Sequence, residues 1–247
     1  MKPDLSIVIP AFNESERLGT PLRKVLPYLA ENRPNSEVIV VDDGSSDDTA
    51  AVAESAFAEF PAIAGRVVRY DVNRGKGFAV KTGLQNAAAD IALFSDADLS
   101  TPIEETPKLV GPIERGEYDV TFGSRAIDRS LIGTHQPWRR EQGGKVMNLI
   151  IRKMSGLDFS DTQCGFKAFN MERFRPLLHM MTIDRFGFDV EFLFVAQYNG
   201  LRLAEIPVRW NDVAGSKVSA FRDARRMVTE LRQIQRNTRR GLYDLKK

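Results

Sequence analysis

The stretch Ile91-Ala92-Leu93-Phe94-Ser95-Asp96-Ala97-Asp98 decides the fold of this 247-residue chain, because an apolar run stops at two acids spaced i, i+2. A short apolar run predicts a buried strand, which places the acids at its carboxyl end. In open α/β folds, ligands bind at that edge of the sheet. Carboxylate oxygens suit Mg²⁺ and Mn²⁺, so Asp96 and Asp98 are candidate metal ligands. Asp and Ser are also common turn residues, and the motif alone fits a plain turn as well.

The residues before this stretch repeat one alternation of apolar run, polar loop and helical pattern. We predict strands over residues 5–10, 37–41, 66–70 and 91–94, and helices over residues 18–29, 49–60 and 78–88. Consecutive apolar positions in 37–41 indicate burial on both faces, as in a parallel sheet. Strands alternating with helices predict an α/β sandwich around a mostly parallel sheet.

A polar loop follows each predicted strand, at residues 10–14, 42–48, 73–77 and 96–100. These loops should converge on one edge of the sheet, where a nucleotide can bind. The first loop lacks Gly-x-Gly-x-x-Gly and the chain lacks a P-loop, which argues against hydride transfer and ATP hydrolysis. An acid-rich nucleotide site repels phosphates unless a cation lies between them, so electrostatics also favour a metal at Asp96 and Asp98.

The composition limits the kinds of site that the chain can form. The formal net charge is only +2, which does not favour nucleic acid as a partner. Cys164 is the only cysteine and there are two histidines, so an internal disulfide is impossible and a zinc site is disfavoured. We find no secretory signal and no run of 18–20 apolar residues, and expect a cytoplasmic protein that is soluble or peripheral to the membrane.

The C-terminal segment 220–247 is basic, with nine Lys and Arg residues against three acids. Its apolar residues recur at helical spacing, at Phe221, Ala224, Val228, Leu231 and Ile234. This pattern predicts a basic amphipathic helix, which either lies on an anionic bilayer or packs its apolar stripe on the domain. Residues 143–154 allow the same two interpretations, as a membrane-contacting helix or an ordinary core helix.

Eight short motifs are spread over nearly the whole chain. They lie at residues 9–14, 41–45, 73–77, 95–98, 123–125, 161–167, 188–191 and 215–217. Together they resemble the family 2 glycosyltransferases of the GT-A fold. Asp-Thr-Gln-Cys-Gly-Phe-Lys at 161–167 and Gly-Ser-Lys at 215–217 are most similar to the dolichyl-phosphate β-glucosyltransferases and other polyprenyl-phosphate glycosyltransferases.

The resemblance implies a Rossmann-like αβα sandwich with a mostly parallel central sheet over residues 1–219. Residues 1–125 would bind a nucleotide sugar, residues 126–219 would bind the acceptor, and the helical tail 220–247 would follow. The resemblance further implies a bound divalent cation, Mg²⁺ or Mn²⁺, at Asp96 and Asp98. The residues expected to bind the nucleotide are Pro10, Ala11, Glu14, Asp42 and Asp43.

Basic residues in or near these motifs are candidates for binding phosphates. Lys76 and Lys217 could place charge on the donor's phosphates, whereas Arg125, Arg139 and Arg140 could bind an acceptor phosphate through bidentate hydrogen bonds. The pair Arg139 and Arg140 also fits a solvated basic turn.

The acceptor decides whether a general base is needed. A lipid monophosphate is largely a dianion at neutral pH and attacks without a strong base. A sugar hydroxyl needs one, and Asp189 or Glu191 is then the best candidate. Both acids also fit a plain role at a helix start, which they would cap or solvate.

Together with these residues, the resemblance implies a metal-dependent inverting transfer of glucose from UDP-glucose to a polyprenyl phosphate, at the cytoplasmic face of the membrane. One alternative is a polyprenyl-phosphate mannosyltransferase that uses GDP-mannose. Another is a family 2 transferase acting on a saccharide hydroxyl. A third, without catalysis, is a nucleotide-sugar-binding module that docks on membranes.

Overall fold

In the part of the chain that the structure describes, seven strands form the central sheet, in the order β3-β2-β1-β4-β7-β5-β8. The structure is a computed structural model and describes residues 2–134, 137–213 and 220–245, with only the backbone of 139, 140 and 220–223. The strands are β1 (Leu5–Ala11), β2 (Ser36–Asp42), β3 (Ala64–Arg69), β4 (Ile91–Ser95), β5 (Val120–Ser124), β7 (Phe166–Asn170) and β8 (Leu203–Pro207). Two short strands, β6 (Ile132–Thr134) and β9 (Trp210–Asn211), pair separately.

The sheet is mostly parallel, as predicted, with β7 as the exception. β7 runs antiparallel between β4 and β5, whereas the other neighbouring strands are parallel. Along β4, Leu93 packs in one hydrophobic cluster, while Ala92 and Phe94 pack in the other on the opposite face. This burial on both faces explains why the sequence of β4 is apolar at consecutive positions.

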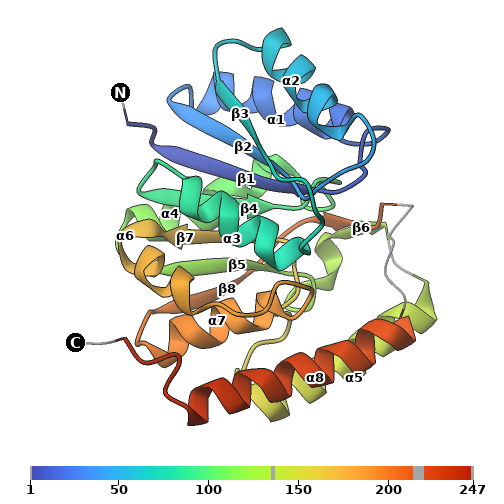
Figure 1. Cartoon of the computed structure of the whole chain (residues 1–247), viewed down its shortest axis with the longest axis vertical. Coiled ribbons are helices and arrows are strands. Elements are labelled where there is room, and N and C mark those ends of the chain that lie inside the picture. The colour runs from blue at the N-terminus through green and yellow to red at the C-terminus, as the bar shows by residue number, and fades with distance from the viewer. Residues whose placement is uncertain (1, 135–136, 214–219, 246–247) are drawn as a thin grey trace.

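Helices cover both faces of the sheet (Figure 1). One face packs against α1 (Gly19–Asn32), α2 (Thr49–Glu59), the short helix η1 (Ile103–Glu105) and α4 (Thr106–Glu114). The other packs against α3 (Lys76–Asn86), α5 (Trp138–Ser155), α6 (Met171–Phe174), η3 (Arg175–Met180), α7 (Phe188–Tyr198) and α8 (Ala220–Arg239). A further short helix, η2 (Arg129–Leu131), precedes β6. This arrangement confirms the predicted α/β sandwich.

The start of α3 differs slightly from the prediction. The helix begins at Lys76 rather than Phe78, because Gly75 adopts a φ of 112° and turns the chain directly into the helix. A side chain at Gly75 would be strained by that φ. Lys76 therefore stands in the first turn of a helix rather than in a loose loop.

The C-terminal helix α8 lies beside α5 along one side of the molecule (Figure 1). It buries Met227, Leu231 and Ile234 in the larger hydrophobic cluster, and Tyr243 beyond it is fully buried. The arginines with described side chains stay exposed, at Arg225, Arg226, Arg232, Arg236, Arg239 and Arg240. Of the two interpretations of the tail, the structure thus shows the apolar stripe packed on the domain. No helix in the described ranges has the length and apolar character to cross a membrane.

Candidate active site

The carboxyl ends of β2, β1 and β4 lie next to one another, because these strands are neighbours in the sheet. Ala11 pairs with Asp42 at the ends of β1 and β2, and β4 ends at Ser95 on the other side of β1. The loops that carry Glu14, Asp42 and Asp96 therefore leave the sheet at one edge.

Asp96 is placed by the strand that lies antiparallel to its own. Its N–H donates to the carbonyl oxygen of Gly165 at 3.0 Å. A Cβ added at Gly165 would lie 2.0 Å from Oδ2 of Asp96, so only glycine leaves room for this carboxylate. On its other oxygen, Oδ1, Asp96 forms an ion pair with Nζ of Lys76 at 2.6 Å.

Asp98 is held in a tight turn directly after Asp96. Its Oδ1 accepts the N–H of Ser100 at 2.9 Å. Leu99 has a φ of 48°, a left-handed conformation that costs a leucine about 1–2 kcal/mol. Such strain concentrates at functional sites, where the surrounding structure enforces it. Hydrogen bonding to Glu14 raises the pKa of Arg17, and the charge of Asp98 adds to that effect, so a guanidinium also lies near Asp98.

The donor set of this pair fits a hard divalent cation. Within the described ranges no group of three His, Cys, Asp or Glu side chains is arranged to hold a metal. Mg²⁺ and Mn²⁺ sites are often built from one or two carboxylates, with phosphate oxygens and water completing the coordination. Asp96 and Asp98 fit a cation of that kind. The ammonium of Lys76 neutralises Asp96 and would compete with the cation for its oxygen.

The candidate nucleotide-binding residues line the β1 and β2 side of this edge. Pro10 and Ala11 are buried at the end of β1. Asp42 is fully buried; its Oδ1 accepts the N–H of Ser45 at 2.9 Å and its Oδ2 lies 3.3 Å from Nε of Arg69. Both oxygens of Glu14 accept hydrogen bonds from Arg17, at 2.8 and 2.7 Å.

Asp43 holds the turn that precedes α3. Its Oδ2 accepts from Asn73 Nδ2 and the N–H of Gly75, and its Oδ1 accepts from the N–H of Arg74, all at 2.8 Å. Gly44 lets the two loops meet, since a Cβ there would lie 2.6 Å from the nitrogen of Asn73. With its oxygens committed to this turn, Asp43 positions Lys76.

Asp189 and a buried lysine extend the charges around Lys76. Nζ of Lys167, which is fully buried, donates to Oδ1 of Asp189 and to the carbonyl of Cys164, each at 2.5 Å. Burial raises the pKa of Asp189, and the charges of Lys167 and Lys76 offset only part of that rise. Burial lowers the pKa of Lys76, but Asp96 and Asp189 outweigh it and raise that pKa overall.

Lys167 is a site residue that sequence reasoning missed. It stands within the apolar strand β7, and its Nζ lies 5.9 Å from the centre of the Phe94 ring, which Lys76 approaches to 5.5 Å. The sequence does contain a signal for this residue, because Lys167 stands among apolar residues in Phe166–Asn170. A buried lysine at such a position requires a partner for its charge. Cys164 is also buried, and desolvation raises the pKa of its thiol to about 11, which fits a small buried residue rather than a nucleophile.

Glu191 points away from this group of charges. It lies two positions after Asp189 in α7, and such residues face different sides of a helix. Its carboxylate is fully buried and accepts hydrogen bonds from the N–H groups of Thr182 and Ile183, from Thr182 Oγ1 and from Tyr243. Both acids lie in the first turn of a helix, but they are buried, so the interpretation that they solvate a helix start is wrong.

The candidate acceptor residues are only partly described. Arg125 donates from Nε and Nη2 to the two oxygens of Asp161, at 2.6 and 2.8 Å, and its guanidinium lies 5.4 Å from the Trp210 ring. Burial opposes its charge, but Asp161 raises the pKa of Arg125 overall. The backbone of Arg139 and Arg140 lies in the first turn of α5, their side chains lie outside the described part, and Lys217 lies outside the described residues.

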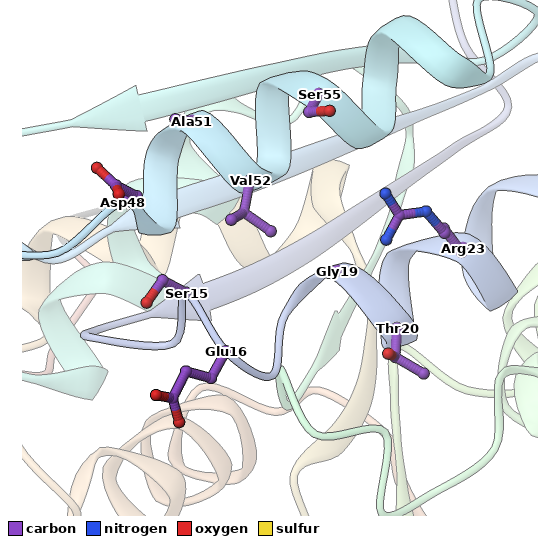
Figure 2. Close-up of a pocket in the computed structure, with 9 residues that line it drawn as sticks. All are labelled: Ser15, Glu16, Gly19, Thr20, Arg23, Asp48, Ala51, Val52 and Ser55. Atoms are coloured by element: carbon purple, nitrogen blue, oxygen red, sulfur yellow. The ribbon is translucent and has the colours of Figure 1, made fainter.

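A separate hollow of about 420 Å³ lies between α1 and α2 (Figure 2). Its lining residues come from both helices and from the loops that precede them, and they include Ser15, Arg23, Asp48 and Ser55. Arg23 is already paired with Glu59 at 2.6 Å. None of the candidate metal, nucleotide or acceptor residues lines this hollow.

Known proteins resemble this chain over nearly its whole length. Residues 6–178 match the model of glycosyl transferase family 2. A dolichyl-phosphate β-glucosyltransferase of Dictyostelium discoideum is 30% identical, with 98% of this chain and 77% of that protein covered. The dolichyl-phosphate β-glucosyltransferase of Homo sapiens is 32% identical, with 88% and 70% covered.

The same fold occurs in a solved structure of glucosyl-3-phosphoglycerate synthase from Mycobacterium tuberculosis, in complex with Mn²⁺, UDP and glucosyl-3-phosphoglycerate. It superposes with a TM-score of 0.70 at 21% identity and covers 94% of this chain and 80% of that one. At this identity the match supports the fold alone, and it agrees with the GT-A prediction. The family model and the relatives confirm the resemblance read from the motifs, and the chain belongs to glycosyl transferase family 2.

Proposed function

We propose that this protein transfers glucose from UDP-glucose to a polyprenyl phosphate of the dolichyl type, with inversion at the anomeric carbon. The observation that carries the proposal is the group of Asp96, Asp98 and Lys76 at the carboxyl edge of the sheet. The relatives named as dolichyl-phosphate β-glucosyltransferases support the donor sugar and the acceptor. The nucleotide and the metal of this proposal are those named in the complex of the solved structure that shares the fold.

Asp96 and Asp98 would hold Mg²⁺ or Mn²⁺ against the diphosphate. A cation bound there neutralises the charge that develops on the diphosphate as the glycosidic bond breaks. Lys76, held by Asp43 and the turn before α3, adds a fixed positive charge beside the same oxygens. Pro10, Ala11 and the buried Asp42 would then line the nucleobase and ribose.

The state of the two candidate bases favours a phosphate acceptor over a sugar hydroxyl. Asp189 is paired with Lys167, and Glu191 is fully buried and hydrogen-bonded, so neither carboxylate is open to a hydroxyl. A phosphate dianion needs no base. Its oxygen forms the new bond to the anomeric carbon from the face opposite the diphosphate, and UDP departs with the electrons of the broken bond.

Exposed side chains on α5 support a peripheral position on the cytoplasmic face of the membrane. Trp138, Val146 and Leu149 are 71%, 60% and 66% exposed, and their spacing places them along one side of the helix. Lys145 and Lys153 are exposed beside them. Apolar and basic residues on one surface are typical of contact with anionic lipid headgroups. The exposed arginines of α8 add to this charge.

An activity assay tests the proposal. We expect the protein, given UDP-glucose, Mn²⁺ and a short-chain polyprenyl phosphate, to form a lipid-linked glucose and release UDP. Parallel reactions with GDP-mannose or with a saccharide acceptor test the two other transferase functions. Product only in one of those reactions would refute the donor or the acceptor named here. Metal-dependent UDP binding without product from any acceptor would instead favour the non-catalytic module.

A further inference from the structure

A loop at residues 181–187 lies against the start of α3. The N–H of Phe78 donates to the carbonyl oxygen of Asp184 at 3.1 Å. A Cβ at Gly75 would lie 2.4 Å from that oxygen, and a Cβ at Gly77 would lie 2.5 Å from the carbonyl oxygen of Ile183. The turn that carries Lys76 thus has no free space on this side. A shift of the loop must move the turn, because packed elements transmit displacement.

Glu191 fixes the other side of the same loop. It accepts the N–H groups of Thr182 and Ile183 at 2.9 Å and the hydroxyl of Thr182 at 2.8 Å. The hydroxyl of Tyr243 donates to the same carboxylate at 2.6 Å. Burial and the neighbouring Glu191 raise the pKa of Tyr243, so this hydroxyl keeps its proton and remains a donor.

The tail helix holds the loop at two further points. Nδ2 of Asn237 in α8 lies 2.9 Å from Thr182 Oγ1 and 3.0 Å from the hydroxyl of Tyr243. Glu230, also in α8, accepts the N–H of Gly187 at 2.8 Å, at a point where a Cβ on Gly187 would collide with its carboxylate. Both ends of the loop are therefore attached to the C-terminal segment.

From these contacts we infer that Glu191 and Tyr243 are positioning residues for the donor site. They hold the loop 181–187 against the turn at residues 73–77, and the turn holds Lys76 beside Asp96. The inference rests on the proposed function, because it assigns to Lys76 a role toward the donor's diphosphate. It adds that α8, the helix bearing the exposed arginines, is mechanically connected to that site. By thermodynamic reciprocity, whatever orders the tail tightens diphosphate binding, and the diphosphate orders the tail.

Hydrogen exchange tests the connection without relying on activity. In Tyr243→Phe, the carboxylate of Glu191 loses one donor, and we expect amides in residues 182–187 and 73–78 to exchange roughly three- to tenfold faster than in the wild type. Glu191→Gln should give a larger effect in the same two segments, because its amide cannot accept every donor that faces it. Faster exchange in 182–187 with no change in 73–78 would overturn the inference.

Ligand binding then tests the role of the connection. With Mn²⁺ present, Tyr243→Phe should weaken binding of UDP about three- to tenfold and leave binding of uridine, which has no diphosphate, unchanged. Asp119→Asn is the matched control, since Asp119 is a buried carboxylate that accepts from Arg202 at the opposite edge of the sheet. Asp119→Asn should lower the stability of the protein without weakening the binding of UDP more than the binding of uridine. An equal loss for both ligands in Tyr243→Phe would show a merely structural role.

The two proposals fail in different ways. If the wild-type protein binds no UDP with Mn²⁺ while Tyr243→Phe still speeds exchange in residues 73–78, the proposed donor is wrong and the mechanical connection stands. If the wild type binds UDP and the variant binds it equally well, the proposed function stands and the inference is wrong.

Discussion

At the scale of single residues, the site depends on opposite charges placed within hydrogen-bonding distance. Lys76 forms an ion pair with Oδ1 of Asp96, so the charge of this carboxylate is already balanced without a cation. A cation bound together with a diphosphate offers Lys76 a second anionic partner and removes this competition. We therefore expect metal and nucleotide to bind together more tightly than either binds alone.

The variant Lys76→Met tests this competition. Removing the ammonium leaves the Asp96 carboxylate without its partner, so Mn²⁺ alone should bind several-fold more tightly, while UDP with Mn²⁺ should bind more weakly. Isothermal titration with and without UDP measures both changes. Lys108→Met is the control and should change neither, because it removes a lysine of α4 that is ion-paired with Glu105 of η1. Weaker binding of Mn²⁺ alone to Lys76→Met would contradict the account.

Gly165 offers a second test at this scale. A methyl group there meets the Asp96 carboxylate at 2.0 Å, so Gly165→Ala should displace Asp96 and lower kcat/KM at least roughly tenfold. The control is Gly144→Ala in α5, where a Cβ meets nothing within 4 Å and should stabilise the helix by about 1 kcal/mol. Thermal unfolding and initial rates of both variants separate loss of stability from loss of the site.

Among the secondary-structure elements, ion pairs on one buried carboxylate connect η1 to α4 and to the segment after β8. Glu105 in η1 is 2% exposed and pairs with Arg209 at 2.5 Å and Lys108 at 2.6 Å. Burial alone would raise its pKa, but these partners lower the pKa of Glu105 below its usual 4.5. A lowered folded-state pKa contributes stability above the unfolded value, and that stability is lost as the pH falls through the folded value.

This linkage predicts a dependence of stability on pH. Between pH 7 and pH 5, Glu105→Gln should unfold at a lower urea concentration than the wild type. The difference in urea midpoint between the two proteins should narrow as the pH falls below about 4.5. There the carboxyl of the unfolded wild type binds a proton that the folded state still excludes. Urea titrations across this range measure it. A difference that stays constant down to the lowest pH at which the protein folds would show that Glu105 acts through packing instead.

The positions of several strands can be predicted from the sequence, but the order and direction in which the strands pair cannot. The apolar runs place β1, β2 and β4 within a residue or two, since burial on both faces leaves a continuous signal. The antiparallel direction of β7 has no such signal, because the apolar period is the same in either direction. The role of Glu191 was equally hidden, because its partner Tyr243 lies 52 residues away and only the fold brings them together.

At the scale of the whole molecule, one surface combines the exposed apolar side chains of α5 with neighbouring basic residues. The pattern of charged and apolar residues predicted the tail helix, but not which of its apolar residues pack against α5 and the domain. Met227, outside the predicted stripe, is buried, whereas Val228 is only partly covered. The surface left open is the one proposed to meet the bilayer.

Binding to lipid vesicles tests that surface. Val146→Asp and Leu149→Asp should each reduce co-sedimentation with anionic vesicles several-fold, because each replaces an exposed apolar contact with a negative charge. Val72→Asp is the control: Val72 is also 71% exposed but follows β3, away from α5. Equal losses in all three variants, or none in the first two, would place the membrane contact elsewhere.

The proposed function depends above all on a divalent cation that Asp96 and Asp98 would hold against the diphosphate of the donor. The most direct measurement is the titration of UDP-glucose into the wild type and Asp98→Ala, each with and without Mn²⁺, with circular dichroism to check the fold. We expect Mn²⁺-dependent binding to the wild type and roughly a hundredfold weaker binding to a folded Asp98→Ala. Binding to Asp98→Ala that remains as tight and as dependent on Mn²⁺ would contradict this expectation.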